Sequence, residues 1–133
     1  MSAHHAAAVQ TLLKTITMPA DIDASGQVPT GWLLAKMDQA GAVLPGQHFR
    51  APVELVGLAD VTLLARPRLG QCVTFTGHLL SSSARDACVA IEAWCEERGQ
   101  TSGTPLMRAQ LRYAPATIEV PGNLFPGTFQ VDS

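Results

Sequence analysis

One carboxylate stands in a predicted helix that is otherwise almost free of charge. Asp38 belongs to the segment 31–44, GWLLAKMDQAGAVL, in which Lys36 is the one other charged side chain. At about 100° per residue, Asp38 falls at the margin of an apolar face, and Lys36 falls on the opposite flank. The side chains expected on the buried face are Leu33, Met37, Ala40, Gly41 and Leu44. An unpaired carboxylate beside a core costs free energy, so Asp38 is either a functional group or a side chain that meets solvent or an arginine across an interface.

The other reactive residue types are not arranged as known sites. His48 and His78 have no partner at ligand spacing, and we interpret them as structural or surface groups. Residues 81–83 are three serines outside a Gly-x-Ser-x-Gly context, so no serine nucleophile is expected. The three cysteines, at positions 72, 88 and 95, lack Cys-x-x-Cys spacing, so no metal site is expected.

A helix and a sheet must position Asp38. The helix is expected to begin at Thr30, whose hydroxyl can cap it, and to end at Pro45-Gly46. A loop is expected over 20–29, and alternation or β-branched content predicts strands at 11–18, 52–64, 72–81, 87–97 and 105–113. One helix and one antiparallel sheet can bury their apolar faces only if the sheet wraps around the helix. We therefore expect an α+β hotdog fold, as a single domain over residues 1–133, with a core at about 11–114 and an extended tail at 115–133.

The amino-acid composition limits which partners and which cellular compartment are expected for this protein. Charged residues make up 15% of the 133 residues, which is low for a monomer surface, and sheet edges need covering, so a homodimer or a larger homo-oligomer is expected. A net charge of −2 leaves no basic field for nucleic acid. The sequence has no uncharged apolar run long enough to predict a membrane-spanning helix, and its N-terminal residues do not resemble a signal peptide. The odd number of cysteines favours a reducing cytoplasm.

Two segments resemble the bacterial hotdog acyl-CoA thioesterases of broad acyl specificity. The loop Met18-Pro-Ala-Asp-Ile-Asp-Ala-Ser-Gly26 is similar to that family's Met-Pro-x-Asp-x-Asn-x-x-Gly. The helix Gly31-Trp-Leu-Leu-Ala-Lys-Met-Asp-Gln-Ala-Gly41 is similar to its Gly-Gly-Trp-(Leu/Ile)-x-x-Gln-Met-Asp-x-(Ala/Gly)-Gly. The turn 66–70, the corner 83–85 and the strand 91–94 add weaker likeness, so the resemblance spans about residues 12–113.

The sequence departs from the family pattern where the loop enters the helix. Gln27 stands in place of an acid or amide, Pro29 in place of an aromatic residue, and Thr30 in place of the first glycine of the pair. The later turn is one residue shorter, with Gln71 where aspartate is usual, and the long C-terminal helix of some relatives is missing. Substrate choice is therefore the least transferable property.

The resemblance implies hydrolysis of an acyl-CoA thioester to a free acid and CoA, with no cofactor beyond the CoA of the substrate. Asp38 would act as general base or nucleophile on a thioester bound across the dimer interface. The N–H of Gly31 or Trp32, at the helix N-terminus, would hold the thioester oxygen. The residues expected to bind the substrate are Thr30, Trp32, Arg66, Arg68, Ser82, Ser83 and Arg85.

Two other functions are compatible with a hotdog fold, and each belongs to a different functional class from a thioesterase. A hotdog domain could bind acyl-CoA or another acyl ligand without hydrolysing it, which the altered residues at 27, 29 and 30 keep open. A hotdog dehydratase or hydratase needs a histidine acting with a carboxylate, and no histidine occurs in the helix or in the loop before it. An assay with acyl-CoA separates the first alternative from the enzyme. Release of free CoA indicates hydrolysis, whereas saturable binding without CoA release indicates a binding domain.

Overall fold

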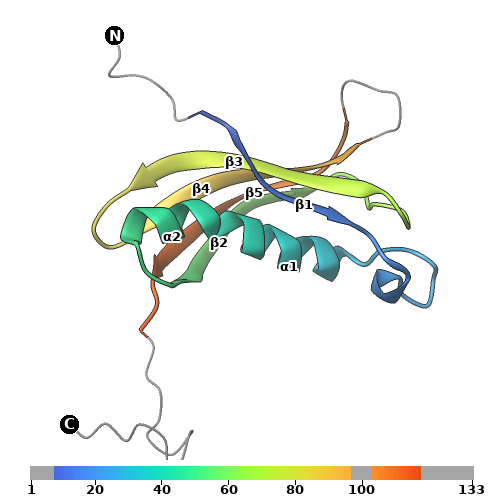
Figure 1. The fold of residues 1–133 in the computed structure, drawn as a ribbon, viewed down its shortest axis with the longest axis horizontal. Helices are drawn as coiled ribbons and strands as arrows, with labels where there is room; N and C mark the ends of the chain where they lie inside the picture. Colours follow the sequence, from blue (N-terminus) through green and yellow to red (C-terminus); the bar gives the residue numbers. More distant parts are fainter. Residues whose placement is uncertain (1–7, 97–102, 118–133) are drawn as a thin grey trace, which may run out of the picture.

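Two helices lie across one face of a five-stranded antiparallel sheet (Figure 1). The computed structural model describes residues 8–96 and 103–117. The helices are α1 (Thr30–Gly41) and α2 (Val43–Phe49), and a 3₁₀ turn, η2, covers Pro19–Asp21. The strands are β1 (Gln10–Ile16), β2 (Val53–Leu63), β3 (Cys72–Ser82), β4 (Ala87–Glu96) and β5 (Thr104–Pro115).

The sheet has the order β1-β3-β4-β5-β2, and every neighbouring pair is antiparallel. This arrangement confirms the α+β hotdog architecture that the sequence predicts. All five expected strands are present, with ends within two residues of the predicted ones, and β5 runs to Pro115 rather than Tyr113. The expected tail at 115–133 therefore begins too early, since Ala116 still donates its N–H to the Pro52 carbonyl at 2.9 Å. Residues 118–133 lie outside the described residues.

The core lies between the helices and the inward face of the sheet. Alternate residues of β4 and β5 point inward, because successive side chains of a strand face opposite sides. The five residues predicted for the buried face of the helix are all buried, four of them in α1 and the fifth, Leu44, in α2. The large side chains buried between the layers include Leu33, Met37, Phe75, Ile91, Met107 and Tyr113.

The predicted start of the helix at Thr30 is confirmed, but its predicted cap and its predicted end are wrong. The N-cap of α1 is Pro29, in extended conformation, and the Thr30 side chain makes no capping bond because Thr30 is already the first helical residue. At the other end the chain does not leave the helix at Pro45-Gly46: it breaks at Ala42 and continues as α2 to Phe49. Pro45 is tolerated because it is the third residue of α2, where an N–H has no intrahelical partner to lose.

The edge strand β2 carries many exposed apolar side chains. It is the last strand in the sheet order, so its outer side has no neighbour among the described residues. Leu58 is 49% exposed and Leu63 is 53% exposed. A long apolar edge of this kind is a template for pairing with another chain. Among the described residues, no helix has the length and hydropathy needed to cross a membrane.

Candidate active site

Asp38 is exposed, and its carboxylate accepts a hydrogen bond from a hydroxyl on strand β5. The Tyr113 hydroxyl donates toward Asp38 Oδ1 at 2.8 Å and lies 3.0 Å from the Asp38 carbonyl oxygen. Tyr113 is 1% exposed and stands on the inward face of β5. No Lys, Arg or His side chain forms an ion pair with Asp38 within residues 8–96 and 103–117. As the helix wheel predicts, Lys36 does not neutralise the carboxylate, and its hydrogen-bond partner is the neutral hydroxyl of Tyr113.

The electrostatics of this pair fix the proton on the tyrosine. Burial raises the pKa of the Tyr113 phenol well above its ordinary value of 10.0, and the bond to Asp38 and the charge of Asp38 raise it further. Tyr113 is thus a neutral donor throughout the range in which a carboxylate is ionised. The sequence does hold a signal for this contact. The chain's single tyrosine falls on the same face of its strand as Met107, Ala109 and Leu111, and a buried phenol needs an acceptor.

The start of α1 presents backbone N–H groups toward solvent. The Trp32 N–H donates to the Pro29 carbonyl at 3.0 Å, whereas the first helical N–H groups, at Thr30 and Gly31, have no intrahelical acceptor by their position. Gly31 is exposed, and a Cβ built on it would meet nothing within 4 Å. The protomer's own packing therefore gives no reason for glycine at this position. Trp32 is half-buried against the core, with the Lys36 ammonium 5.8 Å from its ring centroid.

The turn between β2 and β3 lies beside the loop that leads into α1. The Thr17 hydroxyl donates to the Arg68 carbonyl, and the Gly70 N–H donates to the Thr17 carbonyl at 3.1 Å. Gln71 accepts the Arg68 N–H at 2.6 Å, so it stabilises the turn where the family usually has aspartate. The Ser25 hydroxyl, and after it the Gln27 N–H, lower the pKa of Asp23 in the same loop.

Arg66 and Arg68 are both exposed. The positive charge of Arg66 contributes to the lowered pKa of Asp23, as the smallest of its causes. These two arginines and the N-terminus of α1 are thus at the same end of the molecule.

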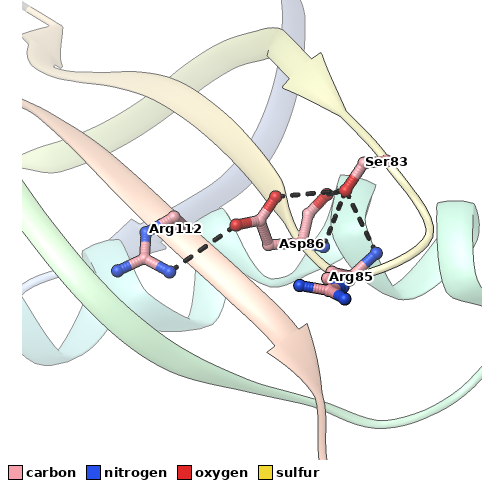
Figure 2. Close-up of polar contacts among 4 residues, drawn as sticks. All are labelled: Ser83, Arg85, Asp86 and Arg112. Atoms are coloured by element: carbon pink, nitrogen blue, oxygen red, sulfur yellow. Dashed lines mark hydrogen bonds and ion pairs between the residues drawn. The ribbon is translucent and has the colours of Figure 1, made fainter.

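The corner between β3 and β4 is tied by the Ser83 hydroxyl (Figure 2). Ser83 Oγ accepts the N–H groups of Arg85 at 3.0 Å and Asp86 at 3.2 Å, and it lies 3.3 Å from Asp86 Oδ1. Asp86 in turn pairs with Arg112 at 3.6 Å. The hydroxyl predicted to contact substrate is thus already used within the corner, while Ser82 and Arg85 are exposed.

His48, at the end of α2, has its Nε2 2.9 Å from the Ser83 carbonyl oxygen. It therefore joins the helix to the corner, which agrees with the structural interpretation made from the sequence. Arg85 lies two residues before Ala87, which is the β4 partner of Tyr113. The corner and the Asp38 carboxylate are thus at the same end of the sheet.

The predicted site residues form two groups at opposite ends of one protomer. Gly31 and Asp38 are seven residues apart on α1, which is about 10 Å along a helix axis. The turn with Arg68 and the corner with Arg85 flank β3, whose 11 residues span about 33 Å. One thioester carbonyl cannot contact both Gly31 and Asp38 of a single chain.

A cavity of about 330 Å³ lies elsewhere, on the sheet face that points away from the helices. Outward residues of the three strands β2, β4 and β5 line it, among them Thr62, Glu92, Arg108 and Gln110. None of the predicted site residues lines this cavity.

Comparison with known proteins connects this geometry to a class of enzymes. No family model matches the chain. A relative from Buchnera aphidicola subsp. Baizongia pistaciae, named an uncharacterized acyl-CoA thioester hydrolase, is 30% identical over 86 residues, covering 65% of this chain and 64% of the relative. The acyl-CoA thioester hydrolase YciA of Escherichia coli is 29% identical over 86 residues, covering 65% of each chain. The chain is similar to these hydrolases over the matched region. The match covers slightly less than two thirds of their length.

Solved structures give the same result for the fold. A hexameric thioesterase from Yersinia pestis superposes with a TM-score of 0.74 at 25% identity, covering 81% of this chain and 88% of that one. An acyl-CoA hydrolase from Staphylococcus aureus, solved with butyryl coenzyme A, coenzyme A and coenzyme A disulfide, superposes with a TM-score of 0.73 at 14% identity, covering 82% and 66%. A further neighbour is described as a hexameric hotdog fold thioesterase of Campylobacter jejuni. The hotdog fold and the resemblance drawn from the sequence are therefore confirmed.

Proposed function

We propose that this hotdog protein hydrolyses acyl-CoA thioesters in a site shared by two subunits, with Asp38 as the group that acts on the thioester. The observation that carries the proposal is the exposed Asp38 carboxylate, oriented by Tyr113 on the strand next to the open edge β2. The residue of β2 that pairs with Tyr113 is Leu55. Asp38 is therefore held one strand away from the edge at which a second copy would pair.

The dimer supplies what one chain lacks. Pairing of two β2 strands would cover their exposed apolar side chains and extend the sheet from one copy into the other. Two copies related by a two-fold axis would bring the start of α1 from one subunit toward the end of α1 from the other. Gly31 of the partner subunit could then approach a thioester that Asp38 also reaches. The hexameric state of the structural neighbours supports a homo-oligomer of this kind.

The chemistry follows from these groups. In one route, Asp38 takes a proton from water as the oxygen attacks the thioester carbon, and the partner's Gly31 N–H stabilises the oxyanion. When the C–S bond breaks, the proton on Asp38 passes to the CoA thiolate, which leaves a free acid, CoA and the regenerated carboxylate. In the other route, the Asp38 carboxylate attacks the carbon directly and the C–S bond breaks, which releases the CoA thiolate and leaves a mixed anhydride. Water then hydrolyses the anhydride to the free acid and the Asp38 carboxylate, and the proton released from that water goes to the thiolate.

CoA carries phosphates, which need cationic donors near the mouth of the site. Arg85 lies at the Asp38 end of the subunit, and Arg66 and Arg68 lie at the Gly31 end. In a shared site, each substrate would therefore meet the corner of one subunit and the turn of the other. No cofactor takes part in this reaction.

The test is a panel of acyl-CoAs assayed with a thiol-detecting reagent, on the wild type and on Asp38→Asn. We expect CoA release by the wild type, and a loss of at least about a hundredfold in Asp38→Asn, the low end of what a positioned base contributes. Acyl-CoA binding should persist in the variant. Glu92→Gln, a carboxylate on the other sheet face, is the matched control and should keep its activity.

Stability separates catalysis from a structural role. In Asp38→Asn the amide oxygen could still accept the Tyr113 hydroxyl, and only the charge of the acceptor is lost, so we expect the unfolding free energy to change by about 1 kcal/mol or less. Saturable acyl-CoA binding by the wild type without CoA release would identify a binding module instead. Near-normal turnover in a folded Asp38→Asn protein would defeat the assignment of Asp38.

A further inference from the structure

The Tyr113 hydroxyl reaches Asp38 through a gap in the surface of α1. A Cβ built on Gly41 would lie 2.6 Å from the Tyr113 hydroxyl oxygen, a separation that real Cβ atoms do not show. Gly41 is the last residue of α1, three residues after Asp38, so the two share one side of the helix. Because Gly41 has only a hydrogen atom in place of a side chain, there is room for the Tyr113 hydroxyl, from a residue 75 positions later, to contact Asp38.

We propose that Tyr113 is a positioning residue for the Asp38 carboxylate, and that position 41 is glycine because a side chain there would displace the tyrosine hydroxyl. This inference rests on the proposed function of Asp38. It gives a physical reason for the Asp-x-x-Gly spacing in the helix that the packing of α1 alone does not provide.

The hydrogen bonds show which oxygen is held and which is left. A phenol has one proton, and the Asp38 carbonyl already accepts the Ala42 N–H at 3.1 Å. The ionised carboxylate is the stronger acceptor, so the proton points mainly to Oδ1, at 2.8 Å. Oδ2 has no partner among the described residues and remains available to water or substrate. A single bond from a fully buried ring thus selects one rotamer of an exposed side chain, which is what a general base or a nucleophile requires.

A purely structural role is the competing explanation, because a buried phenol needs an acceptor whether or not Asp38 is catalytic. The two explanations differ in kinetics. Loss of a structural bond lowers stability and leaves the turnover of each folded molecule unchanged. Loss of a positioning bond lowers kcat and leaves KM nearly unchanged, because the base is no longer held in one orientation.

The first variant is Tyr113→Phe, assayed with an acyl-CoA that the wild type hydrolyses. We expect kcat to fall about tenfold, which corresponds to one hydrogen bond to a charged group, with KM changed less than about twofold. Thr74→Val is the matched control, because the Thr74 hydroxyl, in a residue 7% exposed, donates to the Glu96 carboxylate at 2.9 Å. It should lower stability without changing kcat.

The second variant approaches the same contact from the helix. Gly41→Ala should lower kcat about as much as Tyr113→Phe, since the new methyl group displaces the hydroxyl. In the double variant the hydroxyl oxygen is gone, so the losses should not multiply, and the double variant should be about as active as either single one. The neighbouring Leu111 Cδ2, 3.1 Å from the built Cβ, is the end of a flexible side chain that can move. Thermal melts of each variant give the folded fraction to which kcat is normalised.

Each outcome decides something different. A wild type that releases no CoA, or an Asp38→Asn variant with full activity, would overturn the proposed function and this inference with it. An inactive Asp38→Asn protein beside a Tyr113→Phe protein with unchanged kcat would overturn the positioning role alone. Multiplicative losses in the double variant would show that Gly41 acts independently of the tyrosine hydroxyl, which contradicts the inference.

Discussion

The proton on Tyr113 should make the stability of this protein fall at alkaline pH in a measurable way. In the unfolded chain the phenol ionises with a pKa of about 10. In the folded protein, burial and Asp38 raise that pKa, so the folded state keeps the proton after the unfolded state has lost it. A group with a raised folded pKa contributes its full stability below the unfolded pKa, and that contribution declines as the pH rises above it.

The expected magnitude follows from the linkage relation. Well above pH 10 the folded state is destabilised by about 1.4 kcal/mol for each pH unit, for as long as Tyr113 stays protonated in the folded protein. Over the two units from pH 9 to pH 11 the total is also about 1.4 kcal/mol, because ionisation of the unfolded chain is only half complete at pH 10. Other side chains of the unfolded chain also ionise at alkaline pH, so the comparison must be with a variant that differs only in the phenol.

The assay is denaturant unfolding at several pH values from 8 to 11, for the wild type and for Tyr113→Phe. The difference between their unfolding free energies should shrink by about 1.4 kcal/mol over pH 9–11. Because the chain has one tyrosine, absorbance at the phenolate band reports Tyr113 alone. The wild type should show no phenolate near pH 10 until it unfolds. In Asp38→Asn the phenol should ionise at lower pH than in the wild type, because the charge of Asp38 is removed.

The result that refutes this reasoning is simple to recognise. If native wild-type protein develops the phenolate signal with a midpoint near pH 10, the ring is neither buried nor bonded as the structure describes. A Tyr113→Phe protein with the same alkaline decline as the wild type would place the cause in other groups.

Two further predictions concern the dimer and the helix start. Gly31→Ala should leave the unfolding free energy unchanged or slightly raised, since its Cβ meets nothing within 4 Å, so any loss of turnover would report close approach by a substrate or a second subunit. Leu58→Lys, on the edge strand β2, should shift the oligomer toward monomer in analytical ultracentrifugation. Leu80→Lys, at a position 46% exposed on β3, is the control and should leave the oligomer unchanged. Equal behaviour of the two variants would show that β2 is not the pairing edge.

The sequence predicts the layers of this fold well, because its signals are periodic. The spacing of Leu33, Met37 and Ala40 defines the buried face of α1, and strict alternation in β4 separates inward from outward residues. The cap and the C-terminal end of α1 are predicted poorly, since they depend on competition between neighbouring residues. A threonine hydroxyl and an extended proline are both compatible with the cap position, and the proline at 29 takes it. Likewise a Pro-Gly pair normally ends a helix, but the break at Ala42 makes Pro45 part of a new first turn.

The environment of Asp38 depends on contacts that no local pattern contains. The helix wheel places the carboxylate beside the core face. From that position, the sequence predicts that Asp38 either has no cationic partner or meets an arginine across an interface. What meets it instead is a neutral hydroxyl from β5, and the contact exists only because the sheet order sets β5 between β4 and β2, beneath the C-terminal half of α1. In the sequence, the glycine at 41 is one more small residue on the buried face. In the structure it is the position at which a methyl group would separate Tyr113 from Asp38. Asp38, Gly41 and Tyr113 therefore form one unit, and a variant at any of the three should be judged by its effect on the other two.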